Sequence, residues 1–139
     1  MAVYKNKKTK QSTKGKDIGK ILITDDKYLS TDGYSKKGRR VVITDDDGKN
    51  IKVNKITKDK DYVKGATDAS RKKQKEFTTK IDYKKYPNAL NLPSVVDKKQ
   101  HTINQMTKTK ISKNDKEFID TNERLNKRDR NKVKKLIKK

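Results

Sequence analysis

Short apolar runs separated by polar turns dominate the first half of the sequence. The run from Lys20 to Thr24 (KILIT) has three consecutive apolar residues, which predicts a short strand that is covered on both faces. Two further strand-like runs, Arg39 to Thr44 (RRVVIT) and Lys49 to Thr57 (KNIKVNKIT), flank residues 45–48 (DDDG). Because glycine tolerates a positive φ, Asp-Gly between two such runs predicts a β-hairpin.

The alternation of residues in the second hairpin strand predicts that its two faces differ. One face carries Ile51, Val53 and Lys55, and the other, which is mostly polar and basic, carries Lys52, Asn54 and Ile56. Asp25 to Gly38, between the first two strands, holds two glycines among polar residues and is expected to be a flexible loop. Loops of this kind often carry binding residues.

The second half of the sequence predicts shorter and more scattered elements. Residues 58–80 are polar and are expected to form a long excursion that contains a strand or a short helical turn. Pro93 precedes a short predicted strand from Ser94 to Asp97 (SVVD), and residues 101–103 (HTI) are expected to form another short extended piece.

Two asparagine-based capping signals predict helices near the end of the chain. Asn114-x-x-Glu117 precedes residues 118–119 (FI), which predicts a short helix there. Residues 126–129 (NKRD) repeat this signal with Asp in place of Glu. The apolar residues that follow at helical i, i+3, i+4 spacing are Val133, Leu136 and Ile137. A terminal helix is therefore expected from about Lys127.

Length and composition indicate one small domain. With 139 residues, of which 28% are hydrophobic and 42% charged, the chain can fill a modest core but cannot cover every segment. The elements above predict an α+β, mainly β fold: a small barrel of strands with a C-terminal helix. Residues 1–16, rich in Lys and Thr, are expected to be a disordered basic arm, and residues 17–139 the barrel domain.

The charge balance indicates a polyanionic partner. Forty Lys and Arg against 18 Asp and Glu give a formal net charge of +22, far above the magnitude of about 2–8 that suits a small soluble domain. Nucleic acid is the first candidate, because each phosphate that a cation neutralises releases counterions. An anionic membrane would need bulky apolar anchors, and a chain with no Trp and two Phe offers few. A generally lysine-rich proteome is the alternative explanation of the charge.

Several classes of chemistry have no motif in the sequence. There is no Cys for a disulfide or a zinc–thiolate site, and no Walker loop, dinucleotide fingerprint, HExxH motif or nucleophile elbow. The acidic run at residues 45–47 lacks the downstream ligand of an EF-hand, so a solvated turn is expected there. No metal and no cofactor are expected. With no long apolar run and no signal peptide, the expected location is the cytoplasm.

Several short motifs resemble the MazF/PemK family of ribonuclease toxins, in the family's order of elements. Residues 19–23 (GKILI) are similar to the family's opening G-[DE]-I motif, and residues 38–42 (GRRVV) to its G-x-R-P-V-V motif. Ile56-Thr57 resembles P-[ILC]-T, residues 94–103 (SVVDKKQHTI) resemble the segment that ends in R-T-[IV], and residues 125–133 resemble the L-S-x-x-D segment before the last helix. The sequence departs from the family at Lys20, Arg40 and His101, where the family has an acid, a proline and an arginine.

The resemblance implies an SH3-like barrel, usually dimeric, that cleaves single-stranded RNA without a metal through the substrate's own 2′-OH. Such a reaction needs a proton acceptor, a proton donor and a cation beside the phosphorane. Arg39 carries over as the phosphate-stabilising cation and Thr57 as a hydroxyl donor to the same phosphate. His101, the only histidine, would act as acid or base. Each residue also has a plainer alternative: Arg39 as one more phosphate-binding cation, Thr57 as a residue at the end of a strand, and His101 as a surface histidine.

Residues around these three catalytic candidates are predicted to bind RNA: Tyr34, Lys36, Lys37, Arg40, Lys55, Lys99, Gln100 and Thr102. Three other functions stay open. They are a non-catalytic nucleic-acid-binding module, a ribosome-associated basic protein, and a mobile-element inhibitor of a host defence ribonucleoprotein, such as an anti-CRISPR protein acting on guide RNA. The expected partners are single-stranded RNA, a second copy of the chain, and an antitoxin that is either RNA or a strongly acidic protein.

Overall fold

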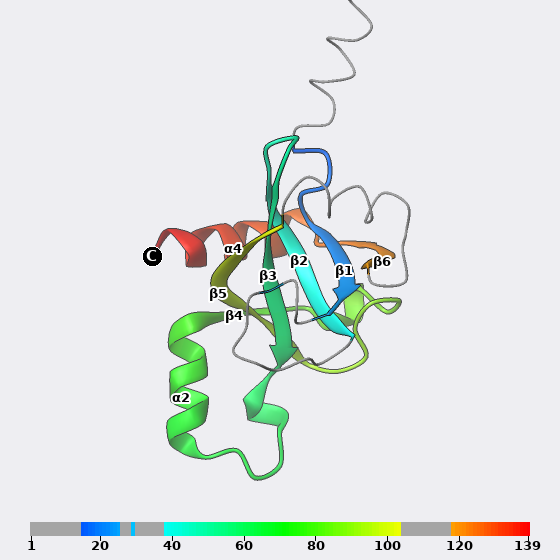
Figure 1. The fold of residues 1–139 in the computed structure, drawn as a ribbon. Helices are drawn as coiled ribbons and strands as arrows, with labels where there is room; N and C mark the ends of the chain where they lie inside the picture. The colour runs from blue at the N-terminus through cyan, green and yellow to red at the C-terminus, as the bar shows by residue number, and fades with distance from the viewer. Residues whose placement is uncertain (1–14, 26–28, 30–37, 104–117) are drawn as a thin grey trace, which may run out of the picture.

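The computed structural model describes residues 15–25, 29, 38–103 and 118–139. These residues form an α+β structure that is mainly β: one antiparallel sheet of six strands with two α-helices, one of them C-terminal (Figure 1). The elements are β1 Lys20–Thr24, β2 Arg39–Asp46, β3 Ile51–Lys58, the 3-10 turn η2 Lys60–Tyr62, α2 Asp68–Phe77, β4 Thr78–Ile81, the 3-10 turn η3 Tyr83–Lys85, β5 Ser94–Ile103, β6 Phe118–Arg124 and α4 Lys127–Lys138. Neither described helix is long and apolar enough to cross a membrane.

Some predicted features fall outside these residues. The basic arm, apart from Gly15 and Lys16, lies outside them, as do most of the loop between β1 and β2 and the capping pair at residues 114–117.

The described chain begins at a turn in which the Gly15 amide donates a hydrogen bond to the Asp46 carbonyl (2.8 Å). This turn leads directly into β1.

The sheet is curled but not closed. Its strand order is β4-β5-β3-β2-β1-β6, and β4 and β6 are its edges within the described part of the chain. Register shifts in the β1–β6, β2–β3 and β3–β5 ladders bend the strands, as bulges do. The described strands therefore form an open sheet, and the predicted barrel is not confirmed. Helix α4 follows β6 and packs against β4 and β5, so it covers the sheet where closure would require β6 to meet β4.

Both faces of the central strands are buried, as the apolar run of β1 predicts. The cluster beneath α4 contains Ile21, Val42, Ile56, Ile81, Tyr86, Ala89, Leu90, Val96, Leu125 and Val133. The cluster on the opposite face contains Leu22, Leu29, Val41, Ile43, Ile51, Val53 and Ile103. Lys52, Asn54 and Ile56 share one face of β3 as predicted, but this face is not exposed along its length, because Asn54 and Ile56 are buried and only Lys52 is exposed.

A buried asparagine explains why residues 94–103 form one strand of ten residues rather than two short pieces. The ladder between β3 and β5 shifts register after Asn54, which leaves carbonyl groups of β5 without ladder partners. The Asn54 side-chain amide donates to the Asp97 carbonyl (2.8 Å) and to the Lys98 carbonyl (3.1 Å). The polar DKKQ stretch can therefore remain within the strand.

The two capping signals near the end of the chain have different outcomes. The predicted terminal helix is confirmed as α4, and the Asn126 side chain accepts a hydrogen bond from the Asp129 amide at its N-terminus (2.8 Å). The other capping pair, at residues 114–117, lies outside the described residues. Residues 118–119, which would be the apolar part of the predicted short helix, begin β6 and pair with β1 instead.

The excursion at residues 58–80 contains η2, α2 and β4, which is more regular structure than the sequence predicts. Thr67 caps α2 by accepting a hydrogen bond from the Ser70 amide (3.1 Å). None of the residues of α2 is buried. The helix is held instead by Gln74, which accepts from the Lys60 amide and donates to the Lys58 carbonyl, both at 2.9 Å.

Gly19 occupies a position where a side chain is excluded. Its φ is +93°, and an added Cβ would lie 2.9 Å from Arg130 Cδ and 3.0 Å from Arg124 Cγ. We expect Gly19→Ala to lower the free energy of unfolding by about 2 kcal/mol, half from the left-handed backbone and half from displaced side chains. The control Gly65→Ala shares the positive φ (+87°) but has nothing within 4 Å. If urea denaturation shows the same loss of unfolding free energy for Gly19→Ala and Gly65→Ala, crowding by Arg124 and Arg130 is not what excludes a side chain at position 19.

Candidate nucleic-acid interface

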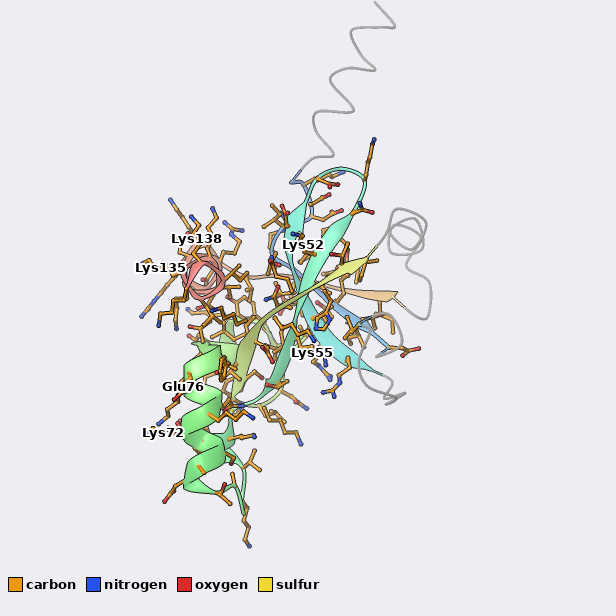
Figure 2. The ribbon with its side chains drawn as sticks, turned by 60° about the vertical axis from the view of Figure 1, so that its left-hand side comes forward. Lys52, Lys55, Lys72, Glu76, Lys135 and Lys138 are labelled. Atoms are coloured by element: carbon orange, nitrogen blue, oxygen red, sulfur yellow. The ribbon has the colours of Figure 1, made fainter. Side chains whose placement is uncertain are left out.

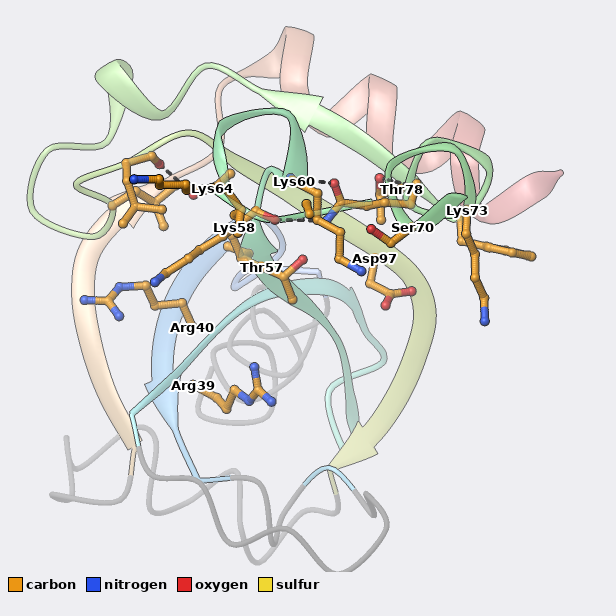
Figure 3. A pocket seen from close by; sticks show the side chains of 18 of the residues that line it. Arg39, Arg40, Thr57, Lys58, Lys60, Lys64, Ser70, Lys73, Thr78 and Asp97 are labelled. Carbon is orange, nitrogen blue, oxygen red and sulfur yellow. Dashed lines mark hydrogen bonds between the residues drawn. The ribbon is translucent and has the colours of Figure 1, made fainter. Parts of the chain in front are cut away.

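A groove of about 1020 Å³ lies where β3 ends, β2 and β5 begin, and the η2–α2 excursion rises beside the sheet (Figure 3). Its cationic lining residues are Arg39, Arg40, Lys58, Lys60, Lys64 and Lys73. Its apolar lining residues are Ile56, Val63, Ala66, Phe77, Leu90 and Leu92. The groove therefore combines cations with an apolar wall, and each set draws on both the strand ends and the excursion.

The cations of the groove exceed its acids. Asp97 is the one acidic residue in the lining. Two further carboxylates on the excursion are paired with other lysines: Lys80 Nζ lies 3.4 Å from Asp59 Oδ2 and 2.9 Å from Asp61 Oδ2. The hydrogen bond from Lys80 lowers the pKa of Asp61, so this carboxylate stays ionised and paired with Lys80. The groove therefore presents an excess of positive charge suited to phosphate groups.

Arg39 and Thr57 lie on the neighbouring strands β2 and β3, at the strand ends that border the groove. The last pair of the β2–β3 ladder is Val41 and Lys55, so both residues lie two positions beyond the paired part of these strands. Both side chains are half-buried and both line the groove (Figure 3). Two of the three predicted catalytic residues are thus brought together.

His101 is not among the residues that line the groove. It pairs with Val53, which pairs with Ile43, so it shares a face of the sheet with Arg39. Four residues of β2 and two strand spacings separate them, which is about 13 Å along the strands and about 10 Å across. The His101 ring is 7% exposed, and its hydrogen bond to the Leu29 backbone holds it at the second apolar cluster.

The pKa of His101 is lowered, chiefly by burial and then by the positive charges of Lys55 and Lys99, against the opposing effect of Asp97. The unfolded chain therefore binds a proton more readily than the folded chain does. We expect the free energy of unfolding to decrease as the pH falls below about 6.5. In urea denaturation between pH 7 and pH 5, His101→Gln should show a weaker dependence on pH. An unchanged dependence in that variant would contradict a buried, neutral histidine.

The residues predicted to bind RNA are spread over several places. Arg40 lines the groove, and its Nε donates to the Ala89 carbonyl (2.6 Å), which fixes its position. Lys55 and Lys99 lie near His101, outside the groove lining. Gln100 and Thr102 are on the opposite face of β5 from His101, and Gln100 donates to the Thr44 hydroxyl (3.2 Å). Tyr34, Lys36 and Lys37 lie outside the described residues.

Sequence reasoning missed the side of the groove that the excursion supplies. It consists of Lys58, Lys60, Lys64, Lys73 and Phe77. The available signal was the capping residue Thr67, followed by ten residues without Gly or Pro. The low apolar content of α2 hid this signal, because a helix without a buried face has no apolar periodicity to detect.

Positive charge also lies away from the groove. Figure 2 shows Lys72 and Glu76 of α2, and Lys135 and Lys138 of α4, pointing away from the sheet. The outer side of α4 is basic because its one acid, Asp129, is buried. The groove differs from these surfaces in being concave and partly apolar. Among the described residues, no group of three or more His, Asp or Glu could hold a metal ion.

Comparison with known proteins adds no relative to this picture. No protein-family model matches the chain, and no curated protein matches it. The resemblance to MazF/PemK proteins stays an expectation from short motifs. Of its three candidate catalytic residues, the groove lining contains Arg39 and Thr57 but not His101.

Proposed function

We propose that the chain binds single-stranded RNA in the groove. The observation that carries this proposal is the lining itself, in which six cations and one acid surround a concavity of about 1020 Å³ with an apolar wall. Lysine and arginine bind the phosphates, and binding gains from the release of counterions. Arg39 provides a planar pair of donors to phosphate oxygens, and the Thr57 hydroxyl is a further donor in the same lining.

The apolar wall favours single strands over duplexes. Bases in a duplex are stacked and paired, so a protein meets mainly backbone and groove edges. Val63, Ala66 and Leu92 gain from contact only if unpaired bases turn toward them. A binder of duplex phosphates would need cations alone. The mixed lining therefore supports a strand whose phosphates and bases are both accessible.

Metal-independent RNA cleavage is a second candidate function, favoured by the presence of both Arg39 and Thr57 in the groove lining. In such a reaction a base removes the 2′-OH proton, the 2′-oxygen attacks phosphorus, and the departing 5′-oxygen receives a proton. Asp97 is the carboxylate in the groove lining that could accept a proton, whereas His101 is buried elsewhere. No lining residue is an evident proton donor near neutral pH. The lining thus supports binding more strongly than cleavage.

The test uses the purified chain and labelled oligonucleotides. We expect single-stranded RNA to bind more tightly than a duplex of the same length. For each tenfold rise in salt concentration, the binding constant should fall by about 0.7 log units per phosphate contact. Equal binding of both forms, or binding insensitive to salt, would overturn the proposal. Incubation with mixed RNA in EDTA tests cleavage. Cutting that is abolished by Arg39→Ala and by Asp97→Asn, both in the groove lining, but is retained by His101→Ala, outside it, would establish an enzyme that acts in the groove.

Finer assignments go with this proposal. The curled sheet supports an SH3-like barrel that α4 keeps open. A location in the cytoplasm is a separate part of the proposal. A second copy of the chain, an antitoxin of RNA or acidic protein, and a host ribonucleoprotein stay as proposed partners. Copurification of a defined ribonucleoprotein with the chain would favour the mobile-element inhibitor over a free RNA binder.

A further inference from the structure

Phe77 is an exposed aromatic side chain on the wall of the groove. It is the last residue of α2, 48% exposed, and belongs to the groove lining. The other large hydrophobic side chains exposed among the described residues are Tyr62 (70%) and Ile119 (41%). Phe77 alone among these three lines the groove. Its ring is therefore accessible at the place where the cations gather.

The neighbours of Phe77 suit a nucleotide. Lys73 precedes it by one helical turn, so both lie on the same side of α2, and both line the groove. Position 78, which begins β4, is fixed by a hydrogen bond from the Thr78 hydroxyl to the Gln74 carbonyl (2.6 Å). An aromatic face with an adjacent ammonium group matches a base and its flanking phosphate. This hydrogen bond fixes the backbone immediately after Phe77.

We propose that Phe77 is a stacking platform for one unpaired base, with Lys73 binding the phosphate next to it. This inference rests on the proposed function and adds a residue that makes the groove selective for unpaired bases. Stacking on an aromatic ring is tolerant of base identity, because every base has a π-face. Recognition at Phe77 thus requires a base but not a particular sequence.

Charge decides between RNA and other occupants of this apolar wall. A second copy of the chain would bring its own net charge of +22 against the cations of the groove. A neutral apolar peptide would leave those cations without anions. Each nucleotide of RNA offers a phosphate for the cations of the lining and a planar base for its apolar residues.

The chain contains no tryptophan, so Phe77→Trp creates a single fluorescent reporter at the proposed platform. We expect single-stranded RNA to quench this tryptophan as it binds, and an abasic oligonucleotide of the same length to leave its emission nearly unchanged. The matched control is Tyr62→Trp, on an exposed side chain of the same excursion outside the groove lining. Its emission should respond weakly to both oligonucleotides.

Binding measurements on two further variants complete the test. Phe77→Ala and Phe77→Leu should each weaken binding of base-containing RNA by about 10-fold and leave binding of the abasic strand unchanged. Equal affinity of wild type and Phe77→Ala for RNA would overturn the stacking role while leaving RNA binding in place. Failure of the wild type to bind RNA would overturn the proposed function itself. Emission that shifts with protein concentration alone, or only with an acidic peptide, would assign the wall to a protein.

Discussion

Replacing Lys58, Lys64 and Lys73 together by glutamate should weaken binding of single-stranded RNA by on the order of 100-fold near physiological salt. The three side chains are exposed and line the groove. Each contact between a cation and a phosphate of a single strand steepens the fall of log binding constant with log salt concentration by about 0.7. Losing three contacts should therefore reduce the magnitude of this slope by about 2. Fluorescence anisotropy at several salt concentrations measures both quantities.

The control for this variant must separate the groove from total charge. Replacing Lys127, Arg128 and Lys134 by glutamate lowers the net charge equally, from +22 to +16, and these three side chains are exposed on α4. Two of them lie in the first helical turn, where glutamate suits the helix dipole. We expect this variant to lose less than 10-fold in affinity, through the long-range field alone. Equal losses in the two variants would show that RNA binds the basic surface at large.

The placement of Arg39 and Thr57 at the same groove could be predicted from the sequence to a useful extent. Asp-Gly at the hairpin turn sets which strands pair, and the apolar alternation of β2 and β3 sets which residues share a face. Arg39 and Thr57 lie two positions beyond the last pair of that ladder, Val41 and Lys55, and both line the groove. The motif resemblance selects the same two residues independently. Local patterns were sufficient here because the two strands are neighbours in the chain.

The position of His101 could not be predicted in the same way. Its location depends on the register shift between β3 and β5, which the buried side chain of Asn54 stabilises. An asparagine at a strand position offers no sign that it bridges two carbonyl groups of another strand. The excursion is a similar case, because Gln74 holds α2 by hydrogen bonds to backbone groups. Polar contacts between distant segments leave no periodic trace in the sequence.

The shape of the groove also depends on how α4 and the chain around η3 are joined. Leu90 and Leu92, which line the groove, follow Tyr86 in the chain. The Tyr86 hydroxyl donates a 2.6 Å hydrogen bond to Asp129 Oδ2 and accepts one from the Asn126 amide (3.0 Å). One buried hydroxyl thus connects the start of α4 to the segment that leads into the groove.

Tyr86→Phe should lower the free energy of unfolding by about 3 kcal/mol, near the upper end for a hydrogen bond to a charged group. The reason is the environment of Asp129, which is 2% exposed and has few donors to replace the hydroxyl. Within the described part of the chain, the Asp82 amide, at 3.3 Å, is the other group outside α4 that donates to this carboxylate. Urea denaturation at pH 7 measures the loss. Tyr83→Phe is the matched control, since Tyr83 is half-buried against the same cluster, and it should lose less than 1 kcal/mol.

The same hydroxyl predicts how stability responds to alkaline pH. Burial, followed by the hydrogen bond to Asp129, raises the pKa of Tyr86 well above its usual range. Above about pH 10 the unfolded chain releases this proton while the folded chain keeps it, so stability should fall as the pH rises. Tyr86→Phe lacks that proton and should lose less stability between pH 9 and pH 11 than wild type or Tyr83→Phe. If all three chains lose stability equally over this range, the Tyr86 hydroxyl is not held as its contacts with Asp129 and Asn126 require, and the link between α4 and the groove must lie in apolar packing alone.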